Sequence, residues 1–306
     1  MLFERRDFDM YAFGRLILVS AVLVCGLFAE ARVEKNVIYG MYSGLALLMD
    51  IHYPEQPNGY GVIHISGSGW SAPLSLDARP LKESGHVRIE GTDVVAAGYT
   101  LFTVNHRATP RFKYPAPLED VQRAVRFVRF HASKYGISPD KIGGLGGSSG
   151  GHLVSMLGML DGDADSKSDS EIDRLSSKIQ AAVVRVPPAD FSSFGGSGSI
   201  GLLLDARLRE GMDPSTTEMR IAIEASPVSH ASADDPPFLL IHGDADETVP
   251  FSQSEKLRDS LKNVGVKAEL VRIKGAGHGP GMPGAEEDSR IGKRAAAWFD
   301  RYLRGI

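Results

Sequence analysis

The sequence of 306 residues contains a single cysteine, Cys25, which lies in an N-terminal segment that we expect to be removed. The mature chain would then have no thiol, which excludes disulfide bonds, a cysteine nucleophile and thiolate metal sites. An excess of basic charge is also absent, because the formal net charge is −4 at pH 7 and no block rich in Lys and Arg occurs. We therefore expect no nucleic acid among its partners.

Long hydrophobic runs are scarce as well. Near the N-terminus, residues 16–28 follow Arg15 and form an apolar run shorter than the roughly 20 residues that cross a membrane. Ala29-Glu30-Ala31 comes next and matches the small-x-small pattern of a leader cleavage site. We predict a signal peptide over residues 1–31, and hence a secreted or periplasmic protein without membrane contact after cleavage. The alternative is an uncleaved N-terminal anchor.

Residues 32–306 alternate between strand-like and helix-like segments, which predicts one α/β domain. About eight short apolar segments read as strands, and most are bounded by Gly or Pro. This pattern favours a mostly parallel sheet covered by helices on both sides. The predicted strands are 33–39, 46–53, 61–65, 99–104, 141–145, 181–186, 238–241 and 267–273, and the predicted helices are 117–134, 149–160, 252–264 and 286–302.

Two stretches interrupt the alternation. Residues 161–178 are rich in Asp and Ser and are expected to form a solvated loop. Residues 187–226 contain Pro187-Pro188, a Gly/Ser run and two short helical patterns. They predict a cap or lid, and the alternative is a surface insertion without a role.

A glycine-rich turn joins the fifth predicted strand to a helix. Residues 145–152 read Leu-Gly-Gly-Ser-Ser-Gly-Gly-His and contain the pattern Gly-x-Ser-x-Gly in two registers, centred on Ser148 or on Ser149. Glycine on both sides allows a serine to sit on a sharp strand-to-helix turn, beside the N–H groups that open the helix. The pattern therefore predicts a nucleophilic serine.

An acid and a histidine follow two later strands, in the order that such a serine requires. The strand at 238–241 runs into a loop that carries Asp244 and Asp246. Asp246 is favoured because it lies further into the loop, whereas Asp244 could cap the turn. The next strand is followed by Gly275-Ala276-Gly277-His278-Gly279, and a histidine between glycines is poorly explained by packing. We predict His278 as the general base, oriented by the acid.

Acyl transfer also needs N–H donors for a negatively charged oxygen. The N–H of the residue after the nucleophile, Ser149 in the first register, is one candidate. Residues 66–70 follow the strand at 61–65 and read Ser-Gly-Ser-Gly-Trp. Small residues let a backbone approach a substrate, so the N–H groups of Gly67 and Ser68 are the other candidates.

With these residues in place, the chain resembles the α/β-hydrolase superfamily. It is most similar to the esterase/lipase branch that includes hormone-sensitive-lipase-like, carbohydrate-esterase-like and feruloyl-esterase-like proteins. The family's elbow, Gly-x-Ser-Ala-Gly-Gly-His, places its nucleophile on Ser148, and its other motifs place the acid on Asp246 and the base on His278. The resemblance is carried by residues 62–70, 104–107, 114–116, 120, 146–152, 225–228 and 236–250.

The resemblance implies an α/β-hydrolase fold with a small cap-like insertion and a serine carboxylic-ester hydrolase that needs no cofactor or metal. Its substrate would be a small-molecule or carbohydrate ester. One departure is that the family's His-Gly-Gly-Gly-Trp loop reads Ser-Gly-Ser-Gly-Trp at 66–70, so its local hydrogen bonding must differ. The rival interpretations are a prolyl-oligopeptidase-like serine peptidase and a non-catalytic binding protein on a hydrolase fold.

Overall fold

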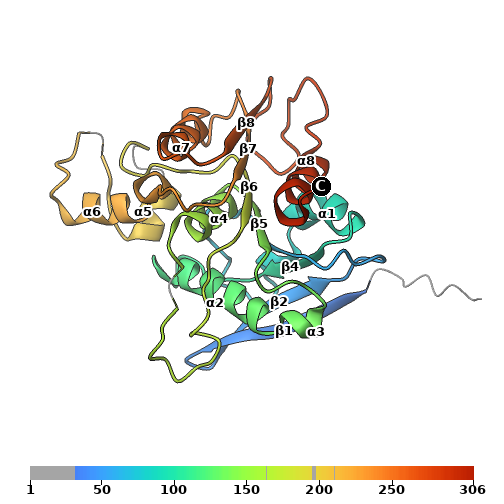
Figure 1. The fold of residues 1–306 in the computed structure, drawn as a ribbon. Helices are drawn as coiled ribbons and strands as arrows, with labels where there is room; N and C mark the ends of the chain where they lie inside the picture. Colours follow the sequence, from blue (N-terminus) through green and yellow to red (C-terminus); the bar gives the residue numbers. More distant parts are fainter. Residues whose placement is uncertain (1–31, 163, 195–197, 210) are drawn as a thin grey trace, which may run out of the picture.

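The computed structural model describes residues 32–306, apart from positions 163, 195–197 and 210. They form an eight-stranded sheet with the order β1-β2-β4-β3-β5-β6-β7-β8 (Figure 1). β1 pairs with β2 and β2 with β4 in antiparallel fashion, and the other neighbours are parallel. The predicted mostly parallel sheet is confirmed. The strands are β1 Val33–Tyr42, β2 Leu45–His52, β3 Gly61–Ile65, β4 Thr100–Val104, β5 Ile142–Gly147, β6 Ala181–Arg185, β7 Phe238–Gly243 and β8 Ala268–Ile273.

The central strands are continuous apolar runs because helices bury them from both sides. Every residue of β3, β4 and β6 is buried. The outer strands β1 and β2 form an antiparallel hairpin instead, and β1 is largely exposed. Their turn residues, Ser43 and Gly44, have φ values of 45° and 82°. Two successive positive φ angles are what a tight two-residue hairpin turn requires.

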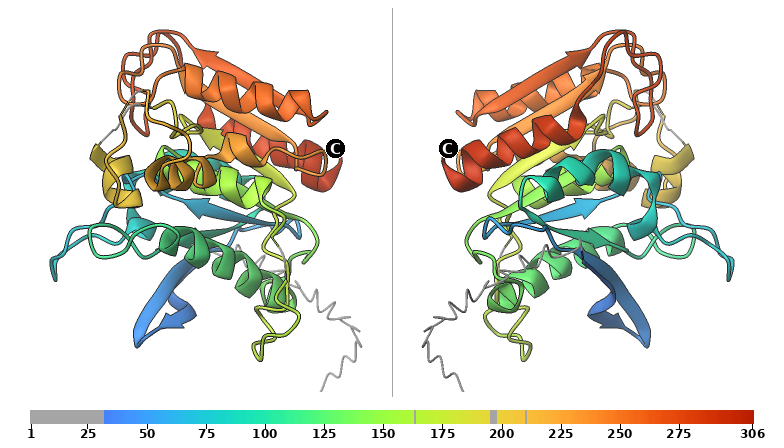
Figure 2. Two further views of the ribbon diagram at one scale, coloured as in Figure 1. Left: turned by 90° about the vertical axis from the view of Figure 1, so that its left-hand side faces the viewer. Right: turned by 90° about the vertical axis from the view of Figure 1, so that its right-hand side faces the viewer.

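Helices cover both faces of the sheet. α2, α4 and α7 pack on one face, and α1 and α8 on the other (Figure 1 and Figure 2). Successive side chains of a strand point to opposite faces, so Val62 and Ile63 of β3 belong to different core clusters. The helices are η1 Leu81–Glu83, η2 Val87–Gly91, α1 Thr92–Ala96, α2 Ala116–Phe130, α3 Ala132–Tyr135, α4 Ser149–Met159, α5 Gly198–Leu204, α6 Thr217–Glu224, η3 Pro227–His230, α7 Ser252–Asn263, α8 Ile291–Phe299 and η4 Asp300–Arg304.

Two predicted helices differ from the structure at their ends. The helix expected over 117–134 is divided, because α2 ends at Phe130 and α3 begins at Ala132. The last helix begins at Ile291 and not at residue 286. Both differences concern helix limits, which periodicity alone defines poorly.

The helices η1, η2 and α1, which fill residues 81–96, were not predicted. The reason is visible in their side chains, because Lys82 and Glu90 are charged and yet buried. Each has a partner far away in the sequence, Asp50 for Lys82 and Arg185 for Glu90. A helix that buries charges lacks the regular apolar stripe by which helices are found in a sequence.

The loop at 161–178, predicted to be solvated, is held by arginines of α2. Nη1 of Arg123 lies 2.6 Å from Oδ1 of Asp173, and Nε of Arg126 donates to the carbonyl of Leu175 at 2.9 Å. The loop is therefore anchored to α2. Its polar composition reflects these bonds as well as contact with water.

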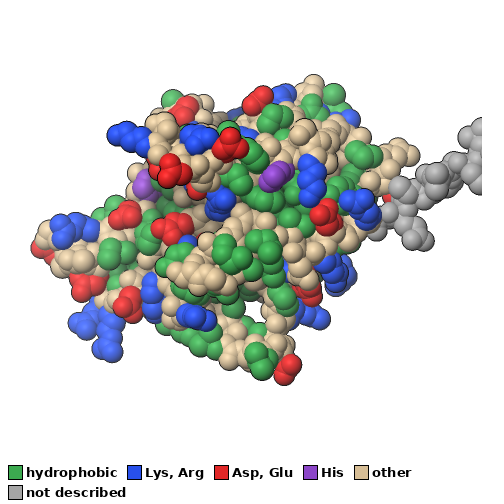
Figure 3. Space-filling model, turned by 90° about the horizontal axis from the view of Figure 1, so that it is seen from below, with side chains coloured by type: hydrophobic (Ala, Val, Ile, Leu, Met, Phe, Trp, Pro, Cys, Tyr) green, Lys and Arg blue, Asp and Glu red, His purple; other side chains and the backbone are tan. Residues whose placement is uncertain are grey.

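The predicted signal peptide over residues 1–31 lies outside the described residues, which begin at Arg32. Within the part of the chain that the structure describes, no helix has both the length and the apolar character needed to cross a bilayer. On the face seen in Figure 3, basic and acidic side chains are interspersed around hydrophobic patches. Charge of neither sign dominates that face.

Candidate active site

Ser148 occupies the sharp turn between β5 and α4. Its φ and ψ are 55° and −125°, a backbone conformation that L-residues rarely adopt. The N–H of Ser148 donates to the carbonyl of Arg185 at 2.8 Å, which fixes the turn to the end of β6. A Cβ atom on Gly146 would lie 2.7 Å from the backbone of Gly150. These two glycines must lack side chains for the turn to close, as the register centred on Ser148 requires.

The structure brings Ser148, His278 and Asp246 together. Nε2 of His278 lies 3.0 Å from Oγ of Ser148, and Nδ1 of His278 lies 2.8 Å from Oδ2 of Asp246. Asp244, the alternative acid, accepts the N–H of Gly275 at 2.8 Å instead. The three side chains follow β5, β7 and β8 at the carboxyl edge of the sheet, where the sequence order predicts them.

Asp246 is buried and held as a carboxylate. Its Oδ1 accepts the N–H groups of Thr248 at 2.9 Å and Val249 at 2.8 Å. Burial alone would raise the pKa of Asp246, but the nearby His242 ring and hydrogen bonds from His278 and the N–H of Val249 hold it well below its ordinary value. An ionised carboxylate at this place accepts the Nδ1–H of His278. The lone pair on Nε2 then faces the Ser148 hydroxyl.

The glycine-rich loop after β3 lies against Ser148. A Cβ atom on Gly67 would be 2.6 Å from the carbonyl oxygen of Gly147 and 3.0 Å from Cβ of Ser148. No hydrogen bond between described residues engages the N–H of Gly67. Ser149 opens α4, and N–H groups in the first turn of a helix have no acceptor within that helix. These two N–H groups are therefore available to a substrate oxygen.

The third predicted donor, Ser68, differs from expectation. Its N–H donates to Oγ of Ser149 at 2.9 Å, so in this conformation it is not free for a substrate. The cause is the hydroxyl of Ser149, which stands where the family pattern has an alanine. The hydroxyls of Ser66 and Ser68 are buried and have no partner among the described residues. In this chain the loop is thus held by the Ser149 hydroxyl through the N–H of Ser68, while its own serine hydroxyls have no partner among the described residues.

The predicted cap region, residues 187–226, borders this loop. A Cβ atom on Gly69 would lie 3.1 Å from Oγ of Ser199 in α5. The carbonyl of Leu203 accepts the N–H of Tyr114 at 2.9 Å, which ties α5 to the segment before α2. The described part of the region thus packs beside the site, and its movement as a lid stays a prediction.

A buried charged cluster behind Ser148 was not predicted from the sequence. Arg185, at the end of β6, forms an ion pair with Glu90 of η2, and His64 and His86 lie against the same carboxylate. His64 is buried but only partly satisfied, because its Nδ1 has no partner among the described residues. A sequence signal existed, since β6 reads Ala-Ala-Val-Val-Arg. An arginine in a fully buried strand requires an acidic partner.

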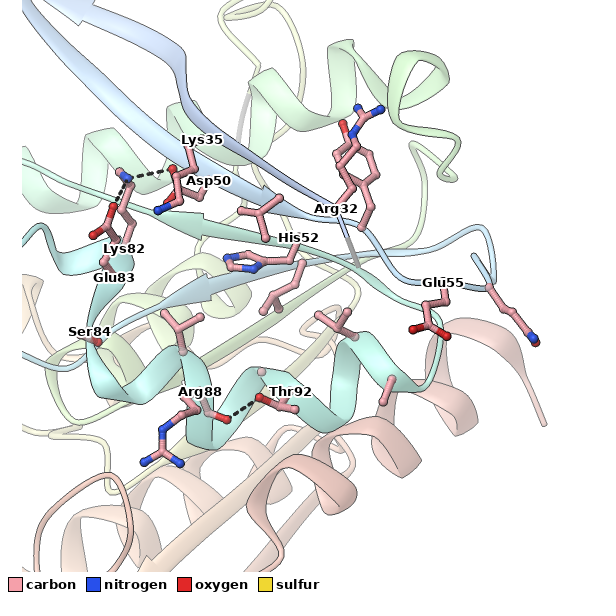
Figure 4. A pocket seen from close by; sticks show the side chains of 18 residues that line it. Arg32, Lys35, Asp50, His52, Glu55, Lys82, Glu83, Ser84, Arg88 and Thr92 are labelled. Carbon is pink, nitrogen blue, oxygen red and sulfur yellow. Dashed lines mark hydrogen bonds and ion pairs between the residues drawn. The ribbon is translucent and has the colours of Figure 1, made fainter. Parts of the chain in front are cut away.

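A groove of about 900 Å³ lies away from these residues, between the first two strands and the η2–α1 segment (Figure 4). Asp50, His52 and Arg88 line it, and no residue of the Ser148 site does. Its wall contains a buried ion pair in which Nζ of Lys82 lies 2.8 Å from Oδ1 of Asp50. The groove and the Ser148 site are thus separate features of the molecule.

Several known proteins that are similar to this chain in sequence or in structure are named as esterases. A family model described as BD-FAE matches residues 49–261. The chain is 34% identical over 167 residues to the probable carboxylic ester hydrolase LipM of Mycobacterium tuberculosis, which covers 55% of this chain and 38% of that protein. Esterase LipC of the same organism is 26% identical over 271 residues, covering 84% of this chain and 62% of that protein. The chain therefore spans less than two thirds of either relative.

Solved structures share the fold over most of the chain. A truncated carbohydrate esterase from gut microbiota has a TM-score of 0.73 and 28% identity, covering 90% of this chain and 97% of that one. An acetyl ester-xyloside bifunctional hydrolase from Caldicellulosiruptor lactoaceticus has a TM-score of 0.73 and 27% identity, with the same coverage of 90% and 97%. The fold of this chain is thus shared with these solved structures over nearly their whole length.

Proposed function

Since the chain belongs to the BD-FAE family, we propose that it hydrolyses carboxylic esters with Ser148 as nucleophile. The observation that carries the proposal is the chain of two short contacts, 3.0 Å from Ser148 to His278 and 2.8 Å from His278 to Asp246. A hydroxyl, an imidazole and a buried carboxylate in this order are suited to nucleophilic catalysis.

The first half of the reaction forms an acyl-enzyme. Nε2 of His278 takes the hydroxyl proton while Oγ of Ser148 attacks the ester carbonyl, whose π electrons move to its oxygen. The N–H groups of Gly67 and Ser149 stabilise that negative charge. The intermediate then collapses, the bond to the alcohol breaks, and the alcohol leaves with the proton from Nε2.

Water completes the cycle by the same route. His278 removes a proton from water, the hydroxide attacks the acyl carbonyl, and the second tetrahedral intermediate expels Oγ of Ser148. Ser148 regains its proton from Nε2, and the carboxylic acid leaves. Asp246 stays ionised throughout and stabilises the imidazolium that forms twice in each turnover.

A fluorophosphonate probe tests the nucleophile. Wild-type protein should be labelled covalently, and Ser148→Ala should not be. Ser149→Ala is the matched comparison, because it removes the neighbouring hydroxyl and should still be labelled, although more slowly, since that hydroxyl holds the N–H of Ser68. Equal labelling of wild type and Ser148→Ala would remove the proposed nucleophile.

We propose acylated carbohydrates as the substrate class. In support, two similar structures are named as carbohydrate esterases or acetyl ester-xyloside hydrolases. The acetylxylan esterase of Xylanibacter ruminicola is 25% identical over 148 residues, covering 48% of this chain and 29% of that protein. Hydrolysis of acetylated xylan and of feruloylated sugars, compared with p-nitrophenyl esters of increasing acyl length, tests the choice. Faster turnover of simple long-chain esters would favour a lipase-like role.

Export from the cytoplasm is part of the same proposal, because a polysaccharide substrate lies outside the cell. It is supported by the leader-like residues 1–31. N-terminal sequencing of the exported protein should find Arg32 first. An exported protein that keeps its leader and stays with the membrane would favour the uncleaved anchor.

A peptidase is the second candidate, for one specific reason. The uncharacterized peptidase YuxL of Bacillus subtilis is 27% identical over 249 residues, covering 75% of this chain and 34% of that protein. Amide and ester hydrolysis use the same three side chains, so the geometry alone does not separate them. A comparison of p-nitrophenyl acetate with a dipeptide amide does, and we expect turnover of the ester only.

A further inference from the structure

A buried ion pair lies directly behind the nucleophile. Nε of Arg185 lies 2.8 Å from Oε1 of Glu90, and the two side chains are 1% and 0% exposed. Burial alone would raise the pKa of Glu90, but the charge of Arg185 and the hydrogen bond from His64 hold it well below its ordinary value. The pair is therefore ionised, although it has no contact with water.

Arg185 is bonded to both parts of the site that must meet. Its backbone carbonyl accepts the N–H of Ser148 at 2.8 Å. Its Nη1 donates to the carbonyl of Gly279, the residue after His278, at 2.7 Å. Its Nη2 lies 3.0 Å from Nδ1 of His86. One residue thus connects the turn that carries the hydroxyl to the loop that carries the imidazole.

The packing around the pair leaves no free space. A Cβ atom on Gly147, the residue before Ser148, would lie 2.6 Å from Oε1 of Glu90 and would also overlap Nη2 of Arg185. The ring of His86 packs against the glycine-rich loop at 66–70, because its Cε1 lies 3.0 Å from the position that a Cβ atom on Gly67 would take. A shift of the ion pair would therefore displace the turn and the Gly67 N–H together.

We propose that Arg185 is a positioning residue, which together with Glu90 sets the distance between Oγ of Ser148 and Nε2 of His278. The inference rests on the proposed function, because that distance matters only if the two atoms exchange a proton. The planar guanidinium donates in several fixed directions, which a lysine ammonium on a flexible stem does not reproduce. Errors of about 1 Å in the placement of reacting groups cost roughly 10²-fold in rate.

An ordinary structural ion pair is the competing interpretation, and the chain offers a matched control. Lys82 and Asp50 form another buried pair, at 2.8 Å with exposures of 1% and 3% (Figure 4). Asp50 lies on β2, three positions from β5 in the sheet. Removal of one partner from either pair leaves a buried charge unpaired and destabilises the fold. Only the Arg185 pair should affect the reaction.

The experiment compares Arg185→Met, Arg185→Lys, Glu90→Gln and Lys82→Met in the full chain. Three quantities are measured for each variant: kcat and KM for p-nitrophenyl acetate, the rate of labelling by a fluorophosphonate, and Tm. We expect Arg185→Met to lower kcat and the labelling rate about 10²-fold with unchanged KM. Lys82→Met should lower Tm and leave kcat and labelling at the wild-type level. Compared with Arg185→Met, Arg185→Lys should restore Tm more than kcat. A lysine keeps the positive charge but lacks the planar guanidinium with its several fixed donors.

Each outcome decides between the interpretations. Wild-type kcat and labelling in folded Arg185→Met would overturn the inference and leave the proposed function intact. Equal losses of kcat and of labelling rate in Arg185→Met and Lys82→Met would overturn the inference too, because the loss of activity would then follow from lower stability alone. Should Arg185→Met not fold, Glu90→Gln carries the same comparison. Wild-type protein that is neither labelled nor active on esters would overturn the proposed function itself.

Discussion

The indole N–H of Trp70 donates to Nδ1 of His152 at 3.2 Å, and Nε2 of His152 lies 2.8 Å from the carbonyl oxygen of Ala225. Because Nδ1 accepts, the ring must be neutral with its proton on Nε2. A second proton would have to sit on Nδ1, where it would meet the Trp70 N–H. Trp70 ends the loop that contains Gly67, so this histidine connects the loop to the core.

We expect the stability of the protein to fall as the pH drops from about 6.5 to about 4 because of His152. Burial lowers the pKa of His152 to about 4, from the ordinary 6.5 that it has in the unfolded chain. Between these values the unfolded chain binds a proton that the folded chain does not, so the contribution is complete above pH 6.5 and is lost on acidification. It is on the order of 3 kcal/mol.

Denaturant unfolding across this pH range measures the effect. His152→Gln removes the titrating group and keeps an amide that can donate to Ala225, so its stability should depend less on pH than that of the wild type. Parallel curves for the two proteins would show that His152 does not titrate in this range.

Replacing Asp246 by asparagine should lower kcat by about 10⁴-fold, as in other triads, because an amide no longer holds the imidazole in the required tautomer. Asp244→Asn is the matched control, since Asp244 lies in the same loop and among the described residues its side chain accepts the N–H of Gly275 alone. Its kcat for p-nitrophenyl acetate should stay at the wild-type level. A larger loss in Asp244→Asn than in Asp246→Asn would reverse the assignment of the acid.

Gly67→Ala should lower kcat by about 10²–10³-fold, the usual cost of one lost oxyanion donor. The added methyl would meet the carbonyl of Gly147 and Cβ of Ser148, so the loop must move away from the substrate. Gly85→Ala provides the comparison, because a Cβ there meets no atom within 4 Å. If both variants keep full activity on p-nitrophenyl acetate, the Gly67 N–H is not a donor in the reaction.

Ser149→Ala should destabilise the protein by about 1–3 kcal/mol, since it leaves the N–H of Ser68 without its acceptor. The change is measured by urea unfolding at pH 7. The loop at 66–70 would then be less firmly held beside Ser148, so the variant should show a larger decrease in kcat than increase in KM. A variant as stable as the wild type would indicate that Ser68 finds another acceptor.

Much of the fold follows from patterns that the sequence displays locally. Strands such as Gly61–Ile65 are short apolar runs between turns, and both predicted limits of β3 agree with the structure. The triad was found because a glycine-rich turn, an acid and a histidine each follow such a strand. Topology then requires them to meet at one edge of the sheet.

What escaped prediction depends on contacts between distant residues. The segment 81–96 is helical although Lys82 and Glu90 are buried, because their partners Asp50 and Arg185 neutralise them in the folded protein. The hydrogen bond from Ser68 to Ser149 also joins residues that are 81 positions apart. No local sequence pattern indicates such pairs. The hydrogen bonding of the glycine-rich loop at 66–70 could therefore be predicted only in part.

The φ angle of 55° at Ser148 has a consequence for engineering. Backbone conformations of this kind cost a residue with a side chain on the order of 1–3 kcal/mol, and glycine adopts them freely. A laboratory selection for heat resistance alone would therefore favour glycine at position 148, where the proposed mechanism needs a hydroxyl. Directed evolution of this enzyme therefore has to screen for turnover in every round, because selection for stability alone would remove the proposed nucleophile.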